Sequence, residues 1–206
     1  MIVVDPQKAR GEALDCLKCA GLEDLVQRLE LDGYFLAPAS KGHHLACVGG
    51  LAAHSVNVTK RLVEITRKLR VRWSGGEASA YRVGMLHDLV KVACYERNVF
   101  KTYATGGRGE KIAEIVRDDG FKYRQPVWPG HGVASVMIAT VEYGVVLNPD
   151  EAAAITYHMG AFGLSGRSLE ELDAALCRFP AQIIATHTAD MLAARIDEPY
   201  EIGGEA

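Results

Sequence analysis

The chain has 206 residues and a formal net charge of −3, with 49% hydrophobic and 24% charged residues. This balance is typical of a globular protein with a substantial core, and the length predicts one domain over residues 1–206. The slightly acidic charge argues against unaided binding to long nucleic acid, because polyanions are held by clustered positive charge.

The five cysteines are scattered through apolar segments, and their odd number predicts reduced thiols and a cytoplasmic location. Cys16 and Cys19 form a CxxC motif, but no second CxxC follows, so we expect this pair to be inert. The longest uncharged apolar run, residues 132–141, is about half the length that a membrane span needs. We therefore expect no membrane association.

Apolar residues at helical spacing dominate the first third of the chain. Asp5 and Pro6 predict a helix start, with a capping carboxylate followed by proline in the first turn. Residues 1–41 are interpreted as an N-terminal helical lead-in. A long amphipathic helix is predicted over residues 45–69, and His54 lies on its apolar face.

The middle of the chain is predicted to contain a helix, a loop and a second, shorter helix. The first of these helices starts near Glu77 and carries His87 and Asp88. Residues 97–108 are expected to form a loop, and residues 110–117 a short helix. We find no two-residue alternation of four or more steps, so the sequence predicts an all-α, single-domain helical bundle.

Four further helices are expected in the last third of the chain. The first covers residues 131–143 and the second opens at Asn148-Pro149, with His158 near its end. The third starts at the capping box of Ser168 and Glu171, and the fourth opens at Pro180 and carries His187 and Asp190.

The adjacent pair His87-Asp88 lies in the apolar segment 84–91. Burying an imidazole and a carboxylate together costs several kcal/mol unless something pairs with them. A cation is the usual partner, and this pair of ligand types suits a divalent transition metal. Taken alone, the pair is equally consistent with a solvated helix end.

Four more residues of the same types fall on other predicted helices, mostly among apolar neighbours: His54, His131, His158 and Asp190. A single histidine of this kind is usually a core residue, but a set on separate helices predicts a metal site inside the bundle. Nitrogen and carboxylate ligands without thiolates indicate Mn, Fe, Co, Ni or Zn rather than Ca.

The order His…His-Asp…His…His…Asp, with Lys91 three residues after the first aspartate, resembles the HD-domain superfamily of metal-dependent phosphohydrolases. The resemblance covers about residues 42–195, the expected metal-binding core. The stretch from His43-His44 to His54 is similar to the HD domain of bacterial 3′–5′ exoribonucleases. Those enzymes also carry an OB-type domain, for which 206 residues leave no room, so a long RNA substrate is not expected.

The resemblance implies a role for each matching position. It implies one or two divalent ions, the first bound by His54, His87, Asp88 and Asp190, the second by His131 and His158 with Asp88 bridging. A one-ion site stays open, with His131 and His158 acting on the leaving group. Lys91 matches the family's lysine near the phosphoryl group, so Lys91 and Asp88 are the expected catalytic residues.

The leading interpretation is a metal-dependent phosphohydrolase or phosphodiesterase acting on a small nucleotide-like phosphoester. Two alternatives stay open: a diiron oxygenase of the same superfamily that cleaves C–C or C–P bonds, and a non-catalytic nucleotide-binding signalling module. His43 and His44 are candidates for the mouth of the site. His187, one helical turn before Asp190, is a candidate for a supporting position, with a core or surface histidine as the alternative. Apolar bundle faces also leave room for a homo-oligomer.

Overall fold

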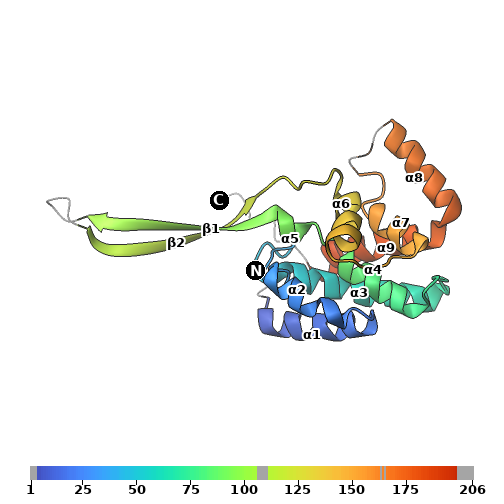
Figure 1. Ribbon diagram of the computed structural model, residues 1–206, viewed down its shortest axis with the longest axis horizontal. Coiled ribbons are helices and arrows are strands. Elements are labelled where there is room, and N and C mark those ends of the chain that lie inside the picture. Colours follow the sequence, from blue (N-terminus) through green and yellow to red (C-terminus); the bar gives the residue numbers. More distant parts are fainter. Residues whose placement is uncertain (1–3, 106–110, 163, 165, 199–206) are drawn as a thin grey trace.

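The computed structural model describes residues 4–105, 111–162, 164 and 166–198. These residues are mostly helical, which confirms the predicted all-α bundle, and a two-stranded ribbon is the exception (Figure 1). The α-helices are α1 (Pro6–Cys19), α2 (Val26–Leu31), α3 (Gly50–Leu69), α4 (Glu77–Leu86), α5 (Lys91–Cys94), α6 (His131–Met137), α7 (Pro149–Thr156), α8 (Arg167–Arg178) and α9 (Pro180–Leu192). Shorter helical turns are η1 (Glu23–Leu25), η2 (Ile138–Glu142) and η3 (Ala193–Asp197), the last two π-helical.

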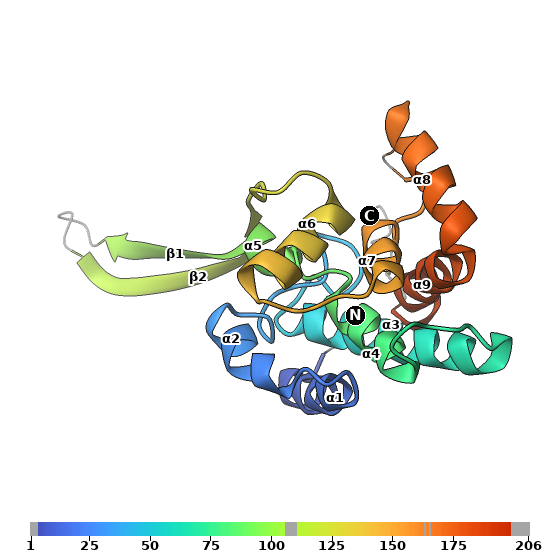
Figure 2. The same ribbon diagram turned by 45° about the vertical axis from the view of Figure 1, so that its right-hand side comes forward.

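Helix α3 packs against α1, α4 and α9, and α7 packs against both α9 and α6 (Figure 2). Helix α1 begins as predicted, because the Asp5 carboxylate accepts hydrogen bonds from the backbone N–H groups of Gln7 and Lys8. The interior is filled by aliphatic side chains from α1, α3, α4 and α7, which exclude water from the faces where the helices meet. Among the most deeply buried are Leu17, Leu51, Leu62, Met85, Leu86 and Ile155.

Helix α3 ends at Leu69 as predicted but begins at Gly50 rather than near residue 45. Leu45 and Gly49 both have positive φ angles, +46° and +79°, which turn the chain before the helix can start. Apolar spacing extends through this turn, so the helical pattern alone placed the start too early. His54 consequently lies in the second turn of the helix, and its side chain is fully buried.

Helix α7 is fixed to α4 by a buried ion pair. The Arg82 guanidinium of α4 lies 3.0 Å from the Glu151 carboxylate, whose side chain is fully buried. The same carboxylate caps α7 by accepting from the Asn148 backbone N–H at 2.8 Å. These contacts fix the first turn of α7 against α4, and His158 follows the other end of the same helix.

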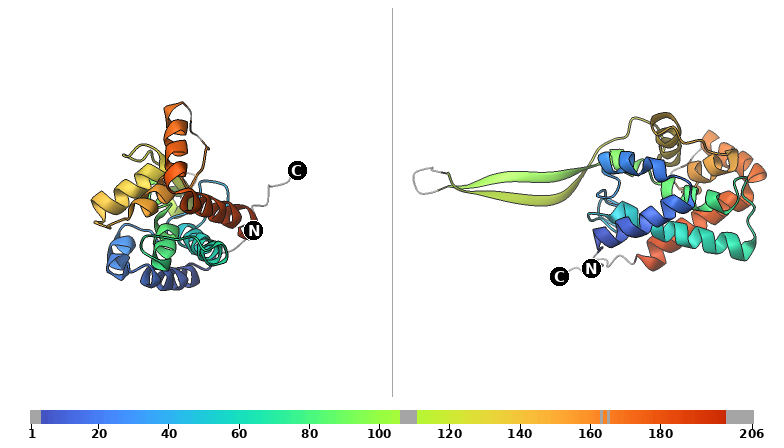
Figure 3. Two further views of the ribbon diagram at one scale, coloured as in Figure 1. Left: turned by 90° about the vertical axis from the view of Figure 1, so that its right-hand side faces the viewer. Right: turned by 60° about the horizontal axis from the view of Figure 1, so that its bottom comes forward.

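The ribbon overturns the prediction for residues 97–117, where we expected a loop and a short helix. Strands β1 (Tyr95–Thr105) and β2 (Lys111–Tyr123) pair antiparallel from Tyr95 opposite Tyr123 to Thr105 opposite Lys111. The ribbon extends away from the helices, as the right view of Figure 3 shows. Both runs are rich in β-branched and aromatic residues and flank Gly106-Gly107, which is a hairpin signal in the sequence.

No helix in the described parts of the chain is both long and apolar enough to cross a bilayer.

Gly84 allows α3 and α4 to approach closely one turn before His87. A Cβ atom at this position would lie 2.7 Å from the Cα of Thr59, closer than side-chain carbons approach in folded proteins. The same measurement at Gly11, on the exposed face of α1, finds open space. The two glycines therefore differ in what a methyl group would contact.

We predict that Gly84→Ala lowers the free energy of unfolding by about 1–3 kcal/mol, because the added methyl group must push α3 and α4 apart. Gly11→Ala is the matched control and should raise it by about 0.5–1 kcal/mol, since alanine loses less backbone entropy in a helix. Urea denaturation followed by circular dichroism measures both. Equal effects of the two substitutions would contradict the close approach of α3 and α4.

Candidate metal centre

The six residues singled out in the sequence come together in one cluster. His54 lies within α3, His87 directly follows α4, and Asp88 is the next residue. The other three come from the second half of the chain: His131 begins α6, His158 follows α7, and Asp190 lies in α9. The cluster therefore lies where five separate parts of the bundle meet.

Asp88 is at the centre of the cluster and faces histidines on both sides. Its Oδ2 atom lies 3.4 Å from the Nε2 atoms of both His54 and His87. Its Oδ1 atom contacts the Nε2 atom of His131 and lies 3.5 Å from that of His158. The two carboxylate oxygens thus divide the histidines into two pairs.

Asp190 completes the first group. Its Oδ1 atom lies 3.2 Å from His54 Nε2, and the Nε2 atoms of His54 and His87 are 3.3 Å apart. Asp190 therefore lies against a group formed by His54, His87 and Asp88, whose ligand atoms all lie within 4.8 Å of one another. A second group, comprising Asp88, His131 and His158, brings its ligand atoms within 4.8 Å of one another.

The backbone determines which nitrogen of two of these histidines carries the proton. His87 Nδ1 donates to the Gly84 carbonyl at 2.8 Å, and His158 Nδ1 donates to the Ile155 carbonyl at 2.7 Å. When these rings are neutral, each therefore presents an Nε2 lone pair to Asp88. Such backbone bonds at Nδ1 are the usual way that a protein orients a histidine ligand.

The Nε2 atom of His158 is buried and has no hydrogen-bond partner among the described residues. An unpaired buried nitrogen is costly unless it has another function. Here it lies 3.5 Å from Asp88 Oδ1, an oxygen that already contacts His131. The residues present therefore fit a bound cation, and the nitrogen and oxygen donors suit a divalent transition metal.

Asp88 is surrounded by cationic side chains and histidines, and His54 is surrounded by carboxylates. Burial acts to raise the pKa of Asp88, but Lys91, His87 and His131 outweigh it and hold that pKa well below its usual value. Burial likewise opposes charge on His54, yet Asp190, Asp88 and Glu198 raise the pKa of His54 well above its usual value. The carboxylates therefore attract positive charge to His54, as either a proton or a metal ion.

The cluster opens into a pocket of about 520 Å³. Asp88, Asp190 and His131 reach the pocket wall, whereas His54, His87 and His158 lie behind it with fully buried side chains. The rest of the lining includes Ser40, Lys41, His43, His44, Lys91, Tyr95, Tyr123, Met159, Met191 and Arg195. A molecule in this pocket would meet the cluster from the Asp88 and His131 side.

The three remaining histidines fall outside the two groups around Asp88. His43 and His44 line the pocket, as suggested for the mouth of the site. Burial, with the nearby charges of His54 and Lys91, lowers the pKa of His44 to about 4, so its ring is neutral at pH 7. His187 donates from Nδ1 to the backbone carbonyl of His158 at 2.7 Å and thus supports that turn of the chain.

Sequence reasoning missed Glu198 and the two tyrosines at the base of the ribbon. Glu198 lies three residues beyond the predicted core and is only 2% exposed, and its carboxylate accepts from His54. It also lies after the last predicted helix position that was assigned a role, Asp190. Tyr95 and Tyr123 line the pocket because they are paired across the ribbon, so the hairpin signal would have revealed them.

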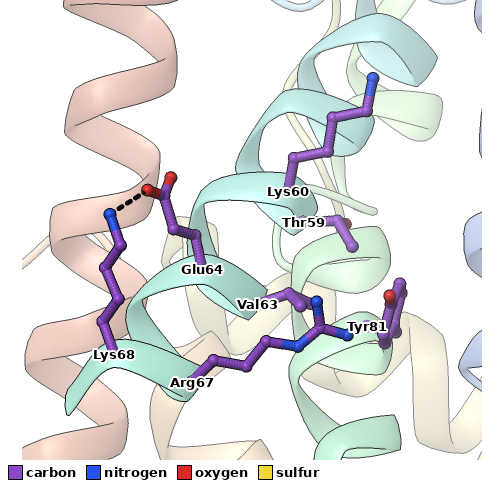
Figure 4. A pocket seen from close by; sticks show the side chains of 7 residues that line it. All are labelled: Thr59, Lys60, Val63, Glu64, Arg67, Lys68 and Tyr81. Atoms are coloured by element: carbon purple, nitrogen blue, oxygen red, sulfur yellow. Dashed lines mark hydrogen bonds and ion pairs between the residues drawn. The ribbon is translucent and has the colours of Figure 1, made fainter.

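A second hollow, of about 350 Å³, lies beside α3 and α4 and is not a candidate site (Figure 4). Its cations are already neutralised: Lys68 lies 2.6 Å from Glu64, Lys60 lies 2.7 Å from Glu12, and Arg67 pairs through two nitrogens with Glu77. These cations thus leave little positive charge for a ligand.

No protein-family model matches the chain, and no curated protein or solved structure matches it either. The function proposed below therefore depends on the geometry of the cluster and on the resemblance in the sequence.

We predict that the protein binds about two equivalents of a divalent transition metal and that His158→Ala binds about one, because two-metal sites share a bridging group. The control is His43→Ala, which removes an exposed histidine from the pocket and should leave the metal content unchanged. Elemental mass spectrometry after metal loading and gel filtration provides the measurement. One equivalent in all three proteins would indicate a single-ion site.

Metal affinity should fall as pH falls from about 8 to 6. The raised pKa of His54 keeps its imidazole protonated near neutral pH, and a cation bound at Nε2 must displace that proton. Calorimetric titrations in buffers of different ionisation enthalpy count the protons released. Binding without proton release and with constant affinity over this range would exclude His54 as a ligand.

Proposed function

We propose that the protein is an HD-type, metal-dependent phosphohydrolase that acts on a nucleotide or nucleotide-like phosphoester. The observation that carries the proposal is Asp88, whose two oxygens are shared between two pairs of histidines at the wall of a pocket. The sequence order of these residues is the order that suggested the HD-domain superfamily.

Divalent ions bound in this cluster would polarise a phosphoryl group and lower the pKa of a water molecule toward neutrality. The protein would contribute the positions of the ligands. Asp88 holds the two halves of the site at a fixed separation, and the buried rings of His87 and His158 are oriented by backbone carbonyls. Such preorganisation lowers the reorganisation needed during the reaction.

Positive side chains around the pocket support an anionic substrate. Lys91 contacts Asp88 Oδ2 and also lines the pocket, so its ammonium group could offset charge on a phosphoryl oxygen. Lys41 and Arg195 lie further along the lining, and neither forms an ion pair within the described part of the chain. These two cations are therefore free to bind a phosphate.

The tyrosines at the base of the ribbon support an aromatic group on that substrate. The rings of Tyr95 and Tyr123 lie edge to face with centroids 5.9 Å apart, and the Tyr123 residue is 46% exposed. Exposed aromatic faces next to a phosphate site are suited to stacking on a nucleobase. This arrangement favours a nucleotide over a simple sugar phosphate.

The general acid depends on how many ions the site binds. His131 lines the pocket with a side chain that is 36% exposed, whereas the His158 side chain is fully buried. In a one-ion site, His131 is therefore the histidine with access to the leaving oxygen, to which it could donate a proton. In a two-ion site both histidines would bind metal instead.

We expect the metal-loaded protein to hydrolyse a phosphodiester chromogen, and we expect Lys91→Met to lower kcat/KM by roughly 10- to 100-fold, about 1.4–2.8 kcal/mol of barrier. Metal content should be retained, because the lysine contacts the carboxylate but is not a ligand. The control Lys68→Met removes an exposed lysine from α3 and should leave kcat/KM unchanged. The test measures the spectrophotometric rate of each protein after a chelator has removed the metal, and again after metal has been added back.

Bound iron with O₂ consumption and no chromogen turnover would overturn the hydrolase assignment in favour of the oxygenase branch. Metal binding without turnover or O₂ consumption, across a panel of nucleotides, would leave a binding module.

A further inference from the structure

The segment that follows α9 reaches back across the bundle to His54. Glu198, directly after the π-helical turn η3, is 2% exposed although it lies near the end of the described chain. Its Oε2 atom lies 3.0 Å from His54 Nδ1, and its Oε1 atom lies 3.2 Å away. A buried carboxylate is expensive unless it has partners, so this contact needs an explanation.

His54 is held between two carboxylates of the same segment. Asp190 faces Nε2 at 3.2 Å, on the side of the cluster, and Glu198 faces Nδ1 at 3.0 Å, on the opposite side of the ring. If a metal ion displaces the proton at Nε2, the Nδ1–H group can still donate to Glu198 while the Nε2 lone pair faces the side of Asp88 and Asp190. His54 is the member of the first group whose Nδ1 partner is a carboxylate rather than a backbone carbonyl.

Helix α3 itself holds Glu198 in place. Asn57, three residues after His54, donates from Nδ2 to Glu198 Oε1 at 2.8 Å. Arg61, one turn further, donates to both carboxylate oxygens of Asp197 at 2.6 and 2.8 Å. These spacings place all three α3 side chains on one helix face, so that face binds both the acidic segment and the cluster.

We propose that Glu198 is a positioning residue that fixes His54 as an Nε2 ligand and strengthens metal binding at the first ion site. A carboxylate that accepts from Nδ1 fixes both the tautomer and the ring orientation, and it raises the basicity of the other nitrogen. The residues 197–198 and the α3 face formed by Asn57 and Arg61 would then act together on His54. This inference rests on the proposed metal centre, but not on the reaction.

A third ion between His44, His54 and Glu198 is the competing explanation, because their ligand atoms also lie within 4.8 Å of one another. Metal ligation of His54 at both nitrogens would require the ring to lose both protons. A hydrogen bond at 3.0 Å explains the same geometry with an ordinary neutral ring. We therefore assign Glu198 to orientation rather than to ligation.

The test compares Glu198→Gln with Glu77→Gln, an exposed glutamate at the start of α4 whose partner is Arg67. Competition with a chromogenic chelator measures Co²⁺ affinity, and the visible spectrum of bound Co²⁺ reports the ligand geometry. In Glu198→Gln we expect the affinity of one ion to fall about 10- to 100-fold with a changed spectrum. The affinity of the other ion, and both affinities in Glu77→Gln, should match those of the unmodified protein.

Asn57→Ala keeps Glu198 but removes its donor, and we expect a smaller loss of affinity for the same ion. If the circular dichroism spectrum shows that Glu198→Gln does not fold, the Co²⁺ affinity of Asn57→Ala tests whether Glu198 positions His54. Wild-type affinities and spectra in both Asn57→Ala and any folded Glu198→Gln protein would overturn the proposal, whatever happens to their melting temperatures. Loss of a third equivalent of metal in His44→Ala would overturn it in favour of ligation.

Absence of Co²⁺ binding to the unmodified protein would refute the metal centre itself, which is a different result from wild-type affinity in Glu198→Gln.

Discussion

The placement of one buried carboxylate, Asp88, constrains most of this structure. It is 2% exposed and lies among three fully buried histidines, His131 and an ammonium group. A charge in such surroundings is tolerated only when donors or cations replace its lost hydration. The helices that supply those partners, α3, α4, α6 and the end of α7, must therefore meet at this point. The close approach at Gly84 and the buried pair Arg82–Glu151 are two of the contacts that bring them there.

Much of the helical fold and of the cluster could be predicted from the sequence. Apolar spacing and caps located α1, α3 and α9, because each helix buries one face and has a recognisable start or stop. His54, His87 and Asp88 were identifiable because polar ligand types stood within apolar helical runs. Their proximity was also predictable, because histidine and aspartate side chains buried on different helices need polar partners. In the interior of a bundle they find those partners mainly in one another.

The unpredicted features depend on contacts between distant parts of the chain. Glu198 meets His54 across 144 positions of sequence, and nothing local in the C-terminal segment indicates that contact. The ribbon was mistaken for a loop and a helix because residues 110–117 also fit a short helical pattern, and pairing between strands determines the outcome. With the ribbon missed, Tyr95 and Tyr123 were also missed, although they form one wall of the pocket.

The ribbon has a further consequence for how the protein behaves at high concentration. Each of its strands pairs with the other and with no further strand in the described residues, so both outer edges present unpaired backbone N–H and C=O groups. Open edges of this kind can recruit strands from neighbouring molecules and begin aggregation. Near the base of the ribbon, the strands carry the exposed charged residues Glu96 and Lys122, which lie opposite each other. Charges along an edge are a common natural defence against such pairing. The base of the ribbon must therefore both resist pairing with other molecules and line the pocket.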